Sequence, residues 1–256
     1  MSSTYYSPGH DRAERVRALF GQIAKRYDLI NDIQSLGLHR IWKRQLVRRA
    51  RITPGTRVLD VCCGTGDLAL AMARIGAKVI GIDFCAPMLA VASARSTADA
   101  ARRDGNRLQL AQADAQELPF VDGAFDVVTI SYGLRNLADL DRGLAEFLRV
   151  LRRGGRLLIL DFGRPDSALW RRAYEAYLGC VVPLFGWLFA ADSAAYAYIL
   201  DSLKRYPAQR GVDDKLRGLG CQRVEIVDFM GGAMSLNLAE NSRSPGSGSD
   251  GDESGK

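Results

Sequence analysis

Residues 58–67 read Val-Leu-Asp-Val-Cys-Cys-Gly-Thr-Gly-Asp, and this stretch decides the fold. Its first four residues have the apolar pattern of a short buried β-strand, and the glycines that follow predict a tight turn. A glycine turn directly after a parallel strand lets the backbone approach a ligand at the carboxyl edge of the sheet. The stretch therefore predicts a parallel sheet with a ligand site at that edge.

Strands and helices alternate on the carboxyl-terminal side of this stretch. Four more strands are predicted at residues 77–82, 108–111, 125–130 and 156–162, with helices at 68–75, 87–103 and 140–151 between them. The basic run and the two glycines at 152–155 are expected to end the last of these helices. This alternation of helices with continuously apolar strands is typical of a doubly wound α/β fold, whose parallel sheet is covered on both faces.

The two ends of the chain differ from this alternating core. Apolar residues at helical spacing predict helices over residues 11–51, interrupted at Gly37. Beyond residue 165 we expect helices at 167–178, 194–206 and 212–219, followed by a strand pair at 221–228 and 232–239. Residues 1–10 are expected to be flexible. Residues 241–256 are expected to be disordered, because they contain no large apolar side chain.

The glycine turn also indicates which ligand the site takes. A dinucleotide site would need a third glycine, and Ala69 stands at that position. Asp67 would also repel a pyrophosphate at the start of the following helix. Asp83, at the end of the second strand, can accept hydrogen bonds from both hydroxyls of a ribose. A ligand with a ribose and no phosphate, S-adenosylmethionine, fits these residues better; a turn that serves only packing is the alternative.

Further polar residues follow the third and fourth strands. Asp114 and Ala115 could hold an adenine, or Asp114 could simply cap the next turn. Arg135 lies in a polar cluster that runs from Ser131 to Asn136. It needs a partner if buried, and Asp139 and Asp141 are the nearby carboxylates that could pair with it.

In the amino-terminal helices, Tyr27 and Asn31 share one face at i, i+4 spacing, either for a function or for packing. His39 lies in a basic stretch and is expected at the surface.

Composition and charge limit the function classes. The chain has 256 residues, of which 47% are hydrophobic and 25% charged, so it is an ordinary globular protein. Its five cysteines show no C-x-x-C spacing and it has two histidines, which argues against a disulfide framework and against a metal site such as zinc, and favours the reduced cytoplasm. The apolar run 176–191 is shorter than the ~20 residues that a membrane-spanning helix needs.

The net charge of +6 is concentrated near the amino terminus, where residues 11–51 hold eleven basic and four acidic side chains. Such a segment could meet phosphate, nucleic acid or an anionic membrane. Its basic residues alternate with apolar residues that must pack on the body, and no stacking aromatic run accompanies them, so nucleic acid is disfavoured.

Several motifs together resemble those of a known family. They are FGQIAKRYDLIN at residues 20–31, SLGLHRIWKR at 35–44, VLDVCCGTGDL at 58–68, ISYGLRNLADLDRGL at 130–144 and RVLRRGGRLLILDF at 149–162. With them, residues 15–239 resemble the ubiquinone/menaquinone biosynthesis C-methyltransferases of the class I S-adenosylmethionine-dependent superfamily. The resemblance implies a Rossmann-like, mostly parallel seven-stranded sheet with an antiparallel carboxyl-terminal strand. It also implies a helical cap at 11–51 and a methyltransferase domain at 52–240 with a helical insertion at about 165–206.

The resemblance further implies a reaction and the residues that serve it. The reaction is the methylation of a ring carbon of a prenylated quinol, here demethylmenaquinol, with a polyprenyl benzoquinol, demethylphylloquinol or another small lipophilic molecule as alternatives. The implied cofactor-binding residues are Gly64, Thr65, Gly66, Asp83, Asp114, Ala115 and Ser131. The implied catalytic residues are Arg135, Tyr27 and Asn136, and the implied substrate-binding residues are Tyr27, Asn31, Tyr132, Arg135 and Tyr196. No metal is expected. The protein is expected to contact the anionic inner face of the cell membrane peripherally and to form a homodimer.

Overall fold

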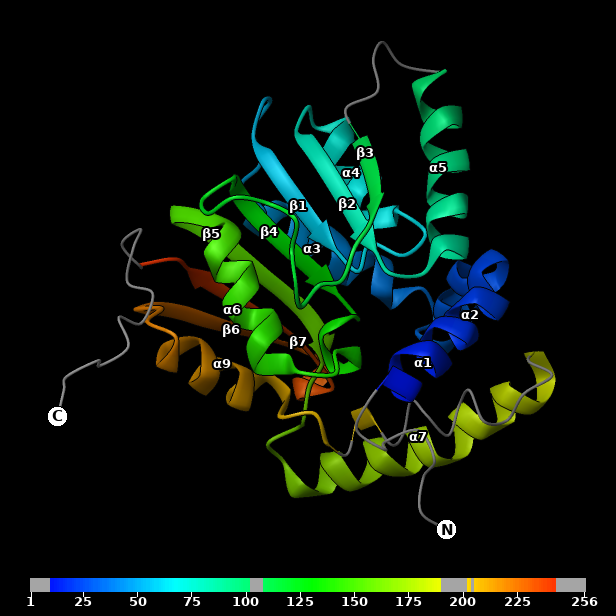
Figure 1. Ribbon diagram of the computed structural model, residues 1–256. Helices are drawn as coiled ribbons and strands as arrows, with labels where there is room; N and C mark the ends of the chain where they lie inside the picture. Colours follow the sequence, from blue (N-terminus) through cyan, green and yellow to red (C-terminus); the bar gives the residue numbers. More distant parts are fainter. Residues whose placement is uncertain (1–9, 102–107, 190–201, 204, 243–256) are drawn as a thin grey trace, which may run out of the picture.

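The structure is a computed structural model that describes residues 10–101, 108–189, 202, 203 and 205–242. Its centre is a seven-stranded sheet with the strand order β3-β2-β1-β4-β5-β7-β6 (Figure 1). The strands are β1 (Arg57–Val61), β2 (Lys78–Asp83), β3 (Leu108–Gln112), β4 (Phe125–Ser131), β5 (Leu151–Phe162), β6 (Arg223–Phe229) and β7 (Met234–Glu240). Neighbours pair in parallel from β3 to β5, whereas β7 is antiparallel to both β5 and β6. This is the predicted doubly wound, mostly parallel sheet with an antiparallel carboxyl-terminal strand.

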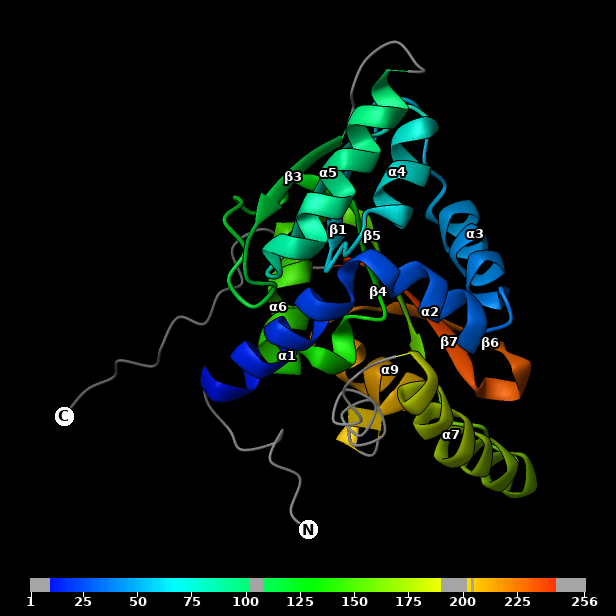
Figure 2. The same cartoon turned by 90° about the vertical axis from the view of Figure 1, so that its right-hand side faces the viewer.

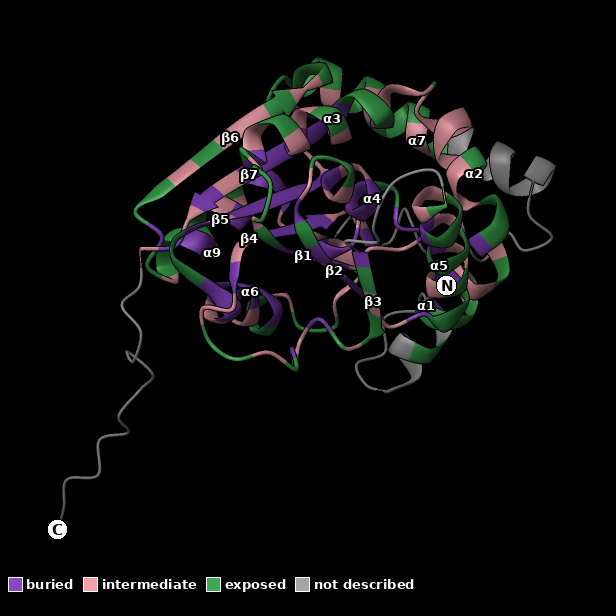
Figure 3. Ribbon diagram, turned by 90° about the horizontal axis from the view of Figure 1, so that it is seen from above, coloured by how far each residue is buried: buried purple, intermediate pink, exposed green. Residues whose placement is uncertain are grey.

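Helices cover both faces of this sheet because alternate strand residues point to opposite sides. On one face, Leu59, Val128 and Leu157 pack with α6 (Leu140–Val150) and α9 (Ala208–Gly218). On the other, Val58, Val127 and Leu158 pack with α3 (Leu38–Ala50) and α4 (Asp67–Arg74). Seen from above, the buried strands form a continuous layer between helices whose outer sides are exposed (Figure 3).

The amino-terminal helices form a cap at the carboxyl end of the parallel strands. The cap consists of α1 (His10–Ile23), the 3-10 turn η2 (Ala24–Arg26) and α2 (Tyr27–Gln34). It packs on α5 (Ala86–Ala100) through a small apolar cluster of Ala24, Cys85 and Met88. Together with α7 (Ala168–Phe189), the cap gathers at the edge of the sheet to which β1–β4 point (Figure 1).

The boundary between α6 and β5 differs from the sequence prediction. Helix α6 ends at Val150, and β5 begins at once with Leu151, whereas a glycine-terminated helix and a strand from Arg156 were expected. Leu151 is buried and pairs with Phe125, and the register then shifts so that Arg156 pairs with Val127. Residues 152–155 are thus an irregularity inside a strand, where the left-handed Gly154 (φ 69°) turns the backbone.

Helix α7 is longer than predicted. It continues through Pro183 to Phe189, although the sequence suggested an end near residue 178. Among the described residues, no helix combines the length and apolar character that crossing a membrane requires. Most of the helix predicted at 194–206 and the predicted tail 241–256 lie outside the described residues.

Candidate active site

The turn after β1 is built from residues with unusual backbone angles. Gly64 (φ 55°) and Gly66 (φ 79°) are left-handed, and so is Cys62 (φ 53°), for which this conformation is unfavourable. A Cβ on Gly66 would lie 3.0 Å from the Cβ of Ala92, so this glycine lets the turn pack against α5. A Cβ on Gly64 would meet nothing within 4 Å and would project into open space. Strain and an open approach at one turn are typical of a ligand site.

Asp83, at the end of β2, is held by this same turn. Its carboxylate accepts hydrogen bonds from the backbone N–H of Gly64 (2.8 Å) and of Cys85 (2.9 Å). Burial raises the pKa of Asp83, and these backbone N–H groups oppose that rise. An ionised carboxylate can accept about four hydrogen bonds, so Asp83 could also accept one from a hydroxyl of a ligand.

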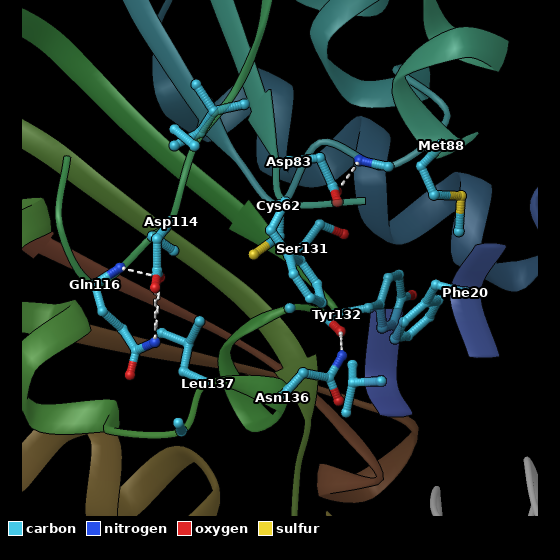
Figure 4. Close-up of a pocket in the computed structure, with 18 of the residues that line it drawn as sticks. Phe20, Cys62, Asp83, Met88, Asp114, Gln116, Ser131, Tyr132, Asn136 and Leu137 are labelled. Carbon is cyan, nitrogen blue, oxygen red and sulfur yellow. Dashed lines mark hydrogen bonds between the residues drawn. The ribbon is translucent and has the colours of Figure 1, made fainter. Parts of the chain in front are cut away.

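Side chains from four strand ends line the strand-end cavity next to this turn (Figure 4). The lining includes Gly64 and Cys62 after β1, Asp83 at the end of β2, Asp114 and Ala115 after β3, Ser131 and Tyr132 at the end of β4, and Phe20 and Tyr27 of the cap. Asp114 also holds its own turn, because its carboxylate accepts from the backbone N–H of Gln116 at 2.8 Å. Both roles that the sequence offered for Asp114, turn capping and a place at the cavity, are therefore compatible with its position.

Ser131 indicates that this cavity is made for a polar ligand. Its hydroxyl is buried, and no hydrogen-bond partner for it occurs among the residues that the structure describes. A buried polar atom without a partner costs about 1–3 kcal/mol, which a bound ligand can offset. With the open approach at Gly64 and the carboxylate of Asp83, the residues present fit a nucleoside-like ligand.

Thr65 is placed differently from its neighbours in the glycine turn. Its side chain is buried and points to the cap, where its hydroxyl donates to Asp28 Oδ1 at 2.9 Å. Asp28 also pairs with Arg95 of α5, and Arg95 donates to the carbonyl oxygen of Thr65 at 3.3 Å. These three residues, which we call the latch, join the cap, the glycine turn and α5.

A second, apolar cavity of about 390 Å³ lies on the other side of the cap residues. It is lined by α2, α3, α7 and the 3-10 turn η4 (Met230–Gly232), with Ile30, Trp42, Tyr174, Tyr177 and Met234 among its side chains. Phe20, Tyr27 and Tyr132 line both cavities, so they form the wall between them. Phe20 and Tyr27 pack edge to face, with ring centroids 6.0 Å apart.

Arg135 brings a positive charge to this apolar cavity. Its side chain is 7% exposed, and its Nε lies 3.5 Å from Asp161 Oδ1 at the end of β5. Its Nη1 donates to Ser202 Oγ (2.8 Å) and to Asn136 Oδ1 (3.3 Å), while the guanidinium carbon lies 5.1 Å from the ring centre of Phe162. The expected partners, Asp139 and Asp141, are engaged elsewhere: Asp139 caps α6 and Asp141 pairs with Lys215. The buried pair with Asp161 could not be read from local spacing, since it joins the 3-10 turn η3 (Leu134–Asn136), which follows β4, to the end of β5.

Tyr27 and Tyr132 both contribute to the wall between the two cavities. Burial raises the pKa of the Tyr27 hydroxyl, while Lys43, Asn31 and Arg135 act in the opposite direction. Tyr132 has a left-handed backbone (φ 60°), and Asn136 donates to its carbonyl oxygen at 3.2 Å. The structure thus brings Tyr27, Asn31, Tyr132 and Arg135 to the apolar cavity and Asn136 to the strand-end cavity. Tyr196 lies outside the described residues.

Two residues of α3 contribute more than the sequence suggested. Lys43, which the sequence did not single out, binds Asp67 Oδ2 at 3.1 Å and lies 6.0 Å from the ring centre of Tyr132. His39 was expected at the surface but is buried at the apolar cavity, with its Nδ1 2.8 Å from Ser35 Oγ. Its burial lowers its pKa. The burial of His39 could have been predicted from the sequence, because helical spacing places His39 on the same apolar face as Trp42 and Leu46.

Comparison with solved structures identifies the class of fold. The chain aligns with a SAM-dependent methyltransferase of Thermotoga maritima at a TM-score of 0.62 and 19% identity, over 88% of this chain and 98% of the other. It also aligns with the phosphoethanolamine N-methyltransferase 2 of Haemonchus contortus, solved in complex with S-adenosyl-L-methionine, at a TM-score of 0.57 and 17% identity over 79% and 52%. The fold is that of the class I methyltransferases.

Sequence comparison narrows this class. A model of the ubiE/COQ5 methyltransferase family matches residues 10–240. The ubiquinone/menaquinone biosynthesis C-methyltransferase of Teredinibacter turnerae is 39% identical over 89% of this chain and 91% of its own. That of Rhizobium leguminosarum is 37% identical over 90% of both chains. The chain belongs to the ubiE/COQ5 methyltransferase family.

Proposed function

We propose that the protein transfers a methyl group from S-adenosylmethionine to a ring carbon of a prenylated quinol, and that this quinol is demethylmenaquinol. The observation that carries the proposal is the pair of cavities that share Phe20, Tyr27 and Tyr132 as a wall. One lies at the strand ends and includes the polar side chains of Asp83, Asp114 and Ser131 in its lining, and the other is apolar and contains the buried Arg135. A nucleoside-like methyl donor in the strand-end cavity and an apolar acceptor in the other cavity would therefore meet at this wall.

In the strand-end cavity we assign the donor's ribose to Asp83 and its adenine to Asp114 and the backbone of Ala115. The glycine turn at Gly64 and Gly66 and the hydroxyl of Ser131 would hold the remainder of the donor. When bound, S-adenosylmethionine supplies a methyl group on a positively charged sulfur, which is already a strong electrophile. The chain's own residues must therefore position the acceptor and make its ring carbon nucleophilic.

Arg135 is the residue that we assign to this second task. A phenolic hydroxyl has a pKa near 10, so its proton must pass to water for the ring carbon to become nucleophilic. Once that carbon carries the methyl group, its own hydrogen leaves as a proton and the oxygen regains one, which restores the aromatic quinol. A guanidinium stabilises the negative charge that develops on the oxygen, and it stays protonated while doing so. Tyr27 and Asn136 would orient the hydroxyl, and Asn31 and Tyr132 would hold the ring. The low exposure of Arg135 strengthens its field at this position.

Substitution of Arg135 tests this role. We expect Arg135→Gln to lower the turnover number by about 10²–10³-fold, the range for losing one preorganised electrostatic donor, with the affinity for S-adenosylmethionine unchanged. Because the substitution also leaves Asp161 buried without its charged partner, Asp161→Asn serves as the matched control for stability. A variant with normal turnover would contradict the role, and a variant that no longer binds the donor would make Arg135 structural.

The identity of the ring is tested with purified quinols. Demethylmenaquinol, a polyprenyl benzoquinol lacking the methyl group and demethylphylloquinol would each be incubated with the enzyme and S-adenosylmethionine, with products identified by mass spectrometry. We expect the highest kcat/KM with demethylmenaquinol. A preference for the benzoquinol would replace menaquinone by ubiquinone biosynthesis, and no turnover with any quinol would refute the substrate class.

A further inference from the structure

Four side-chain atoms in the lining of the apolar cavity are buried without a hydrogen-bond partner among the residues that the structure describes. They are Asn31 Nδ2 and Gln34 Nε2 on α2, Tyr132 Oη after β4, and Arg135 Nε. All four can donate a hydrogen bond. A buried donor without an acceptor is unfavourable, so native proteins keep few of them, and a bound ligand is one way to complete such a group. The cavity therefore fits a ligand that brings acceptor oxygens into it.

Three of these donors already have a task in the proposed function. Arg135 stabilises the phenolate oxygen of the acceptor, and Asn31 and Tyr132 hold its ring. Burial raises the pKa of the Tyr27 hydroxyl and the amide of Asn31 opposes that rise, so Asn31 also acts on a neighbour within the protein. Gln34 is the donor to which the proposed function gives no task.

Helix α2 places Gln34 away from the strand-end cavity. Tyr27, Asn31 and Gln34 are spaced i, i+4, i+7, so they lie on one face of the helix, and all three line the apolar cavity. At a rise of about 1.5 Å per residue, Gln34 lies roughly 10 Å from Tyr27 along the helix axis. Tyr27 belongs to the wall between the two cavities, whereas Gln34 lines the apolar cavity and not the strand-end cavity. Gln34 is therefore the amide farther from the methyl donor.

The end of α2 that carries Gln34 is held by neighbouring helices. The hydroxyl of Tyr177 on α7 donates to the backbone carbonyl oxygen of Gln34 at 3.2 Å. Ser35, the next residue, donates from its hydroxyl to the carbonyl oxygen of Asn31 at 2.6 Å, and its Oγ lies 2.8 Å from His39 Nδ1 on α3. Figure 2 shows α2 and α7 on the same side of the molecule, beyond the carboxyl end of the sheet. These bonds fix the backbone at Gln34 and use the carbonyl oxygens of Asn31 and Gln34, so the side-chain amide remains for a ligand.

A quinol carries an acceptor oxygen that suits this position. Its two oxygens lie on opposite sides of the ring, one beside the carbon that takes the methyl group and the other beside the carbon that bears the prenyl chain. The first oxygen belongs near the wall with Arg135, because Tyr132 and Asn136, on either side of Arg135 in the chain, line the strand-end cavity. The second oxygen then lies across the ring from Arg135, farther from the wall, where Gln34 provides a donor.

We propose that the side-chain amide of Gln34 donates a hydrogen bond to the second ring oxygen of the acceptor and makes the enzyme selective for a ring with two opposite hydroxyls over a ring with one. This inference rests on the proposed function, because it takes the acceptor to be a quinol. Arg135 and Gln34 together fix the orientation of the ring, and with it the carbon that faces the methyl donor. A site that binds a substrate oxygen discriminates against an analogue lacking it, because the buried donor is then left unpaired.

Gln34→Met tests the proposal, since methionine keeps the unbranched shape and helix propensity of glutamine and removes the donor. KM and kcat would be measured with demethylmenaquinol and with a prenylated naphthol that keeps the hydroxyl beside the methyl-accepting carbon and lacks the other. With the quinol, we expect KM to rise by about two- to tenfold, the range for one neutral hydrogen bond, and kcat to stay within about twofold. With the naphthol, variant and wild type should agree within about twofold. If the naphthol is bound without turnover, its Ki against the quinol gives the same comparison.

The stability of the ligand-free protein gives a second measurement. Replacing a buried donor that has no partner removes its unfavourable burial, so Gln34→Met should raise Tm by about 2–4 °C. A glutamine that serves only the structure would instead lower Tm when it is replaced.

The matched control is Gln22→Met. Gln22 is exposed on α1 of the same cap and lines neither cavity, so this variant should leave KM and Tm unchanged. Equal losses with the quinol and the naphthol, or a lower Tm for Gln34→Met, would overturn the assignment of Gln34 and leave the methyl transfer standing. A wild-type enzyme that neither methylates nor binds either compound would refute the proposed function, and the assignment with it.

Discussion

At the scale of single residues, Asp60 of β1 is a buried carboxyl group inside the sheet. It is 1% exposed, and its Oδ1 accepts a hydrogen bond from Thr129 Oγ1 at 2.7 Å. No partner for its Oδ2 occurs in the described part of the chain. Burial raises the pKa of Asp60 from 3.8 to about 7, and the bond from Thr129 opposes this rise. The carboxyl group is thus poised to change its charge near neutral pH.

This shift predicts how stability depends on pH. Because the folded-state pKa lies above the unfolded value, the folded state binds more protons between pH 4 and pH 7, and its stability falls as the pH rises through this window. We expect Asp60→Asn to remove that dependence and, in the absence of ligand, to stabilise the protein at pH 8 by about 2–4 kcal/mol. Denaturant unfolding at pH 5 and pH 8 measures it, with the exposed Asp141→Asn as a control that should show no such gain. Identical pH profiles for Asp60→Asn and wild type would contradict the raised pKa.

At the scale of elements, the latch joins the cap to the glycine turn. Asp28 of α2 accepts a hydrogen bond from the hydroxyl of Thr65 and pairs with Arg95 of α5. The position of α2 is therefore coupled to the turn beside the strand-end cavity. We predict that Asp28→Asn raises the KM for S-adenosylmethionine by about five- to tenfold, since a charge-assisted bond contributes about 1.5–3 kcal/mol and the site is partly exposed. The turnover number at saturating S-adenosylmethionine should change by a smaller factor than this KM.

The same helix provides a control for this prediction. Asp32 of α2 forms an exposed pair with Arg40 that touches neither the turn nor α5, and such pairs contribute about 0–1 kcal/mol. Asp32→Asn should therefore leave the KM for S-adenosylmethionine within about twofold of the wild-type value. If both variants weaken the donor equally, the effect comes from the cap in general and the latch has no special role.

Comparison of elements also shows what the sequence could predict. The order of strands and helices followed from apolar periodicity, and the glycine turn with Asp83 placed the strand-end cavity, because these signals lie within one or two elements. The partner of Arg135 and the early start of β5 at Leu151 did not follow. Each depends on a contact between distant segments, such as Arg135 with Asp161 or Leu151 with Phe125, which local spacing does not encode.

At the scale of the whole molecule, the cap and the sheet both contribute residues to the two cavities. Phe20 and Tyr27 of the cap line both cavities, and α1 and η2 pack on α5 through Ala24 and Met88. A ligand in the strand-end cavity contacts both parts, so its binding free energy must stabilise the cap as well as the sheet. Such linkage amounts to about 2.7 kcal/mol at a ligand concentration of one hundred times Kd.

This coupling predicts the pattern of hydrogen exchange. Saturation with S-adenosylhomocysteine should slow amide exchange in α1 and α2, which lie at the cavity, by up to about a hundredfold, and should leave the outer helix α9 nearly unchanged. In Asp28→Asn, protection should persist in β2 around Asp83 but decline in α2, because the latch that transmits binding to that helix is broken. Exchange followed by mass spectrometry resolves these segments in one experiment. Equal slowing throughout the chain would mean that the cap and the sheet open only together, and the latch would then carry no separate coupling.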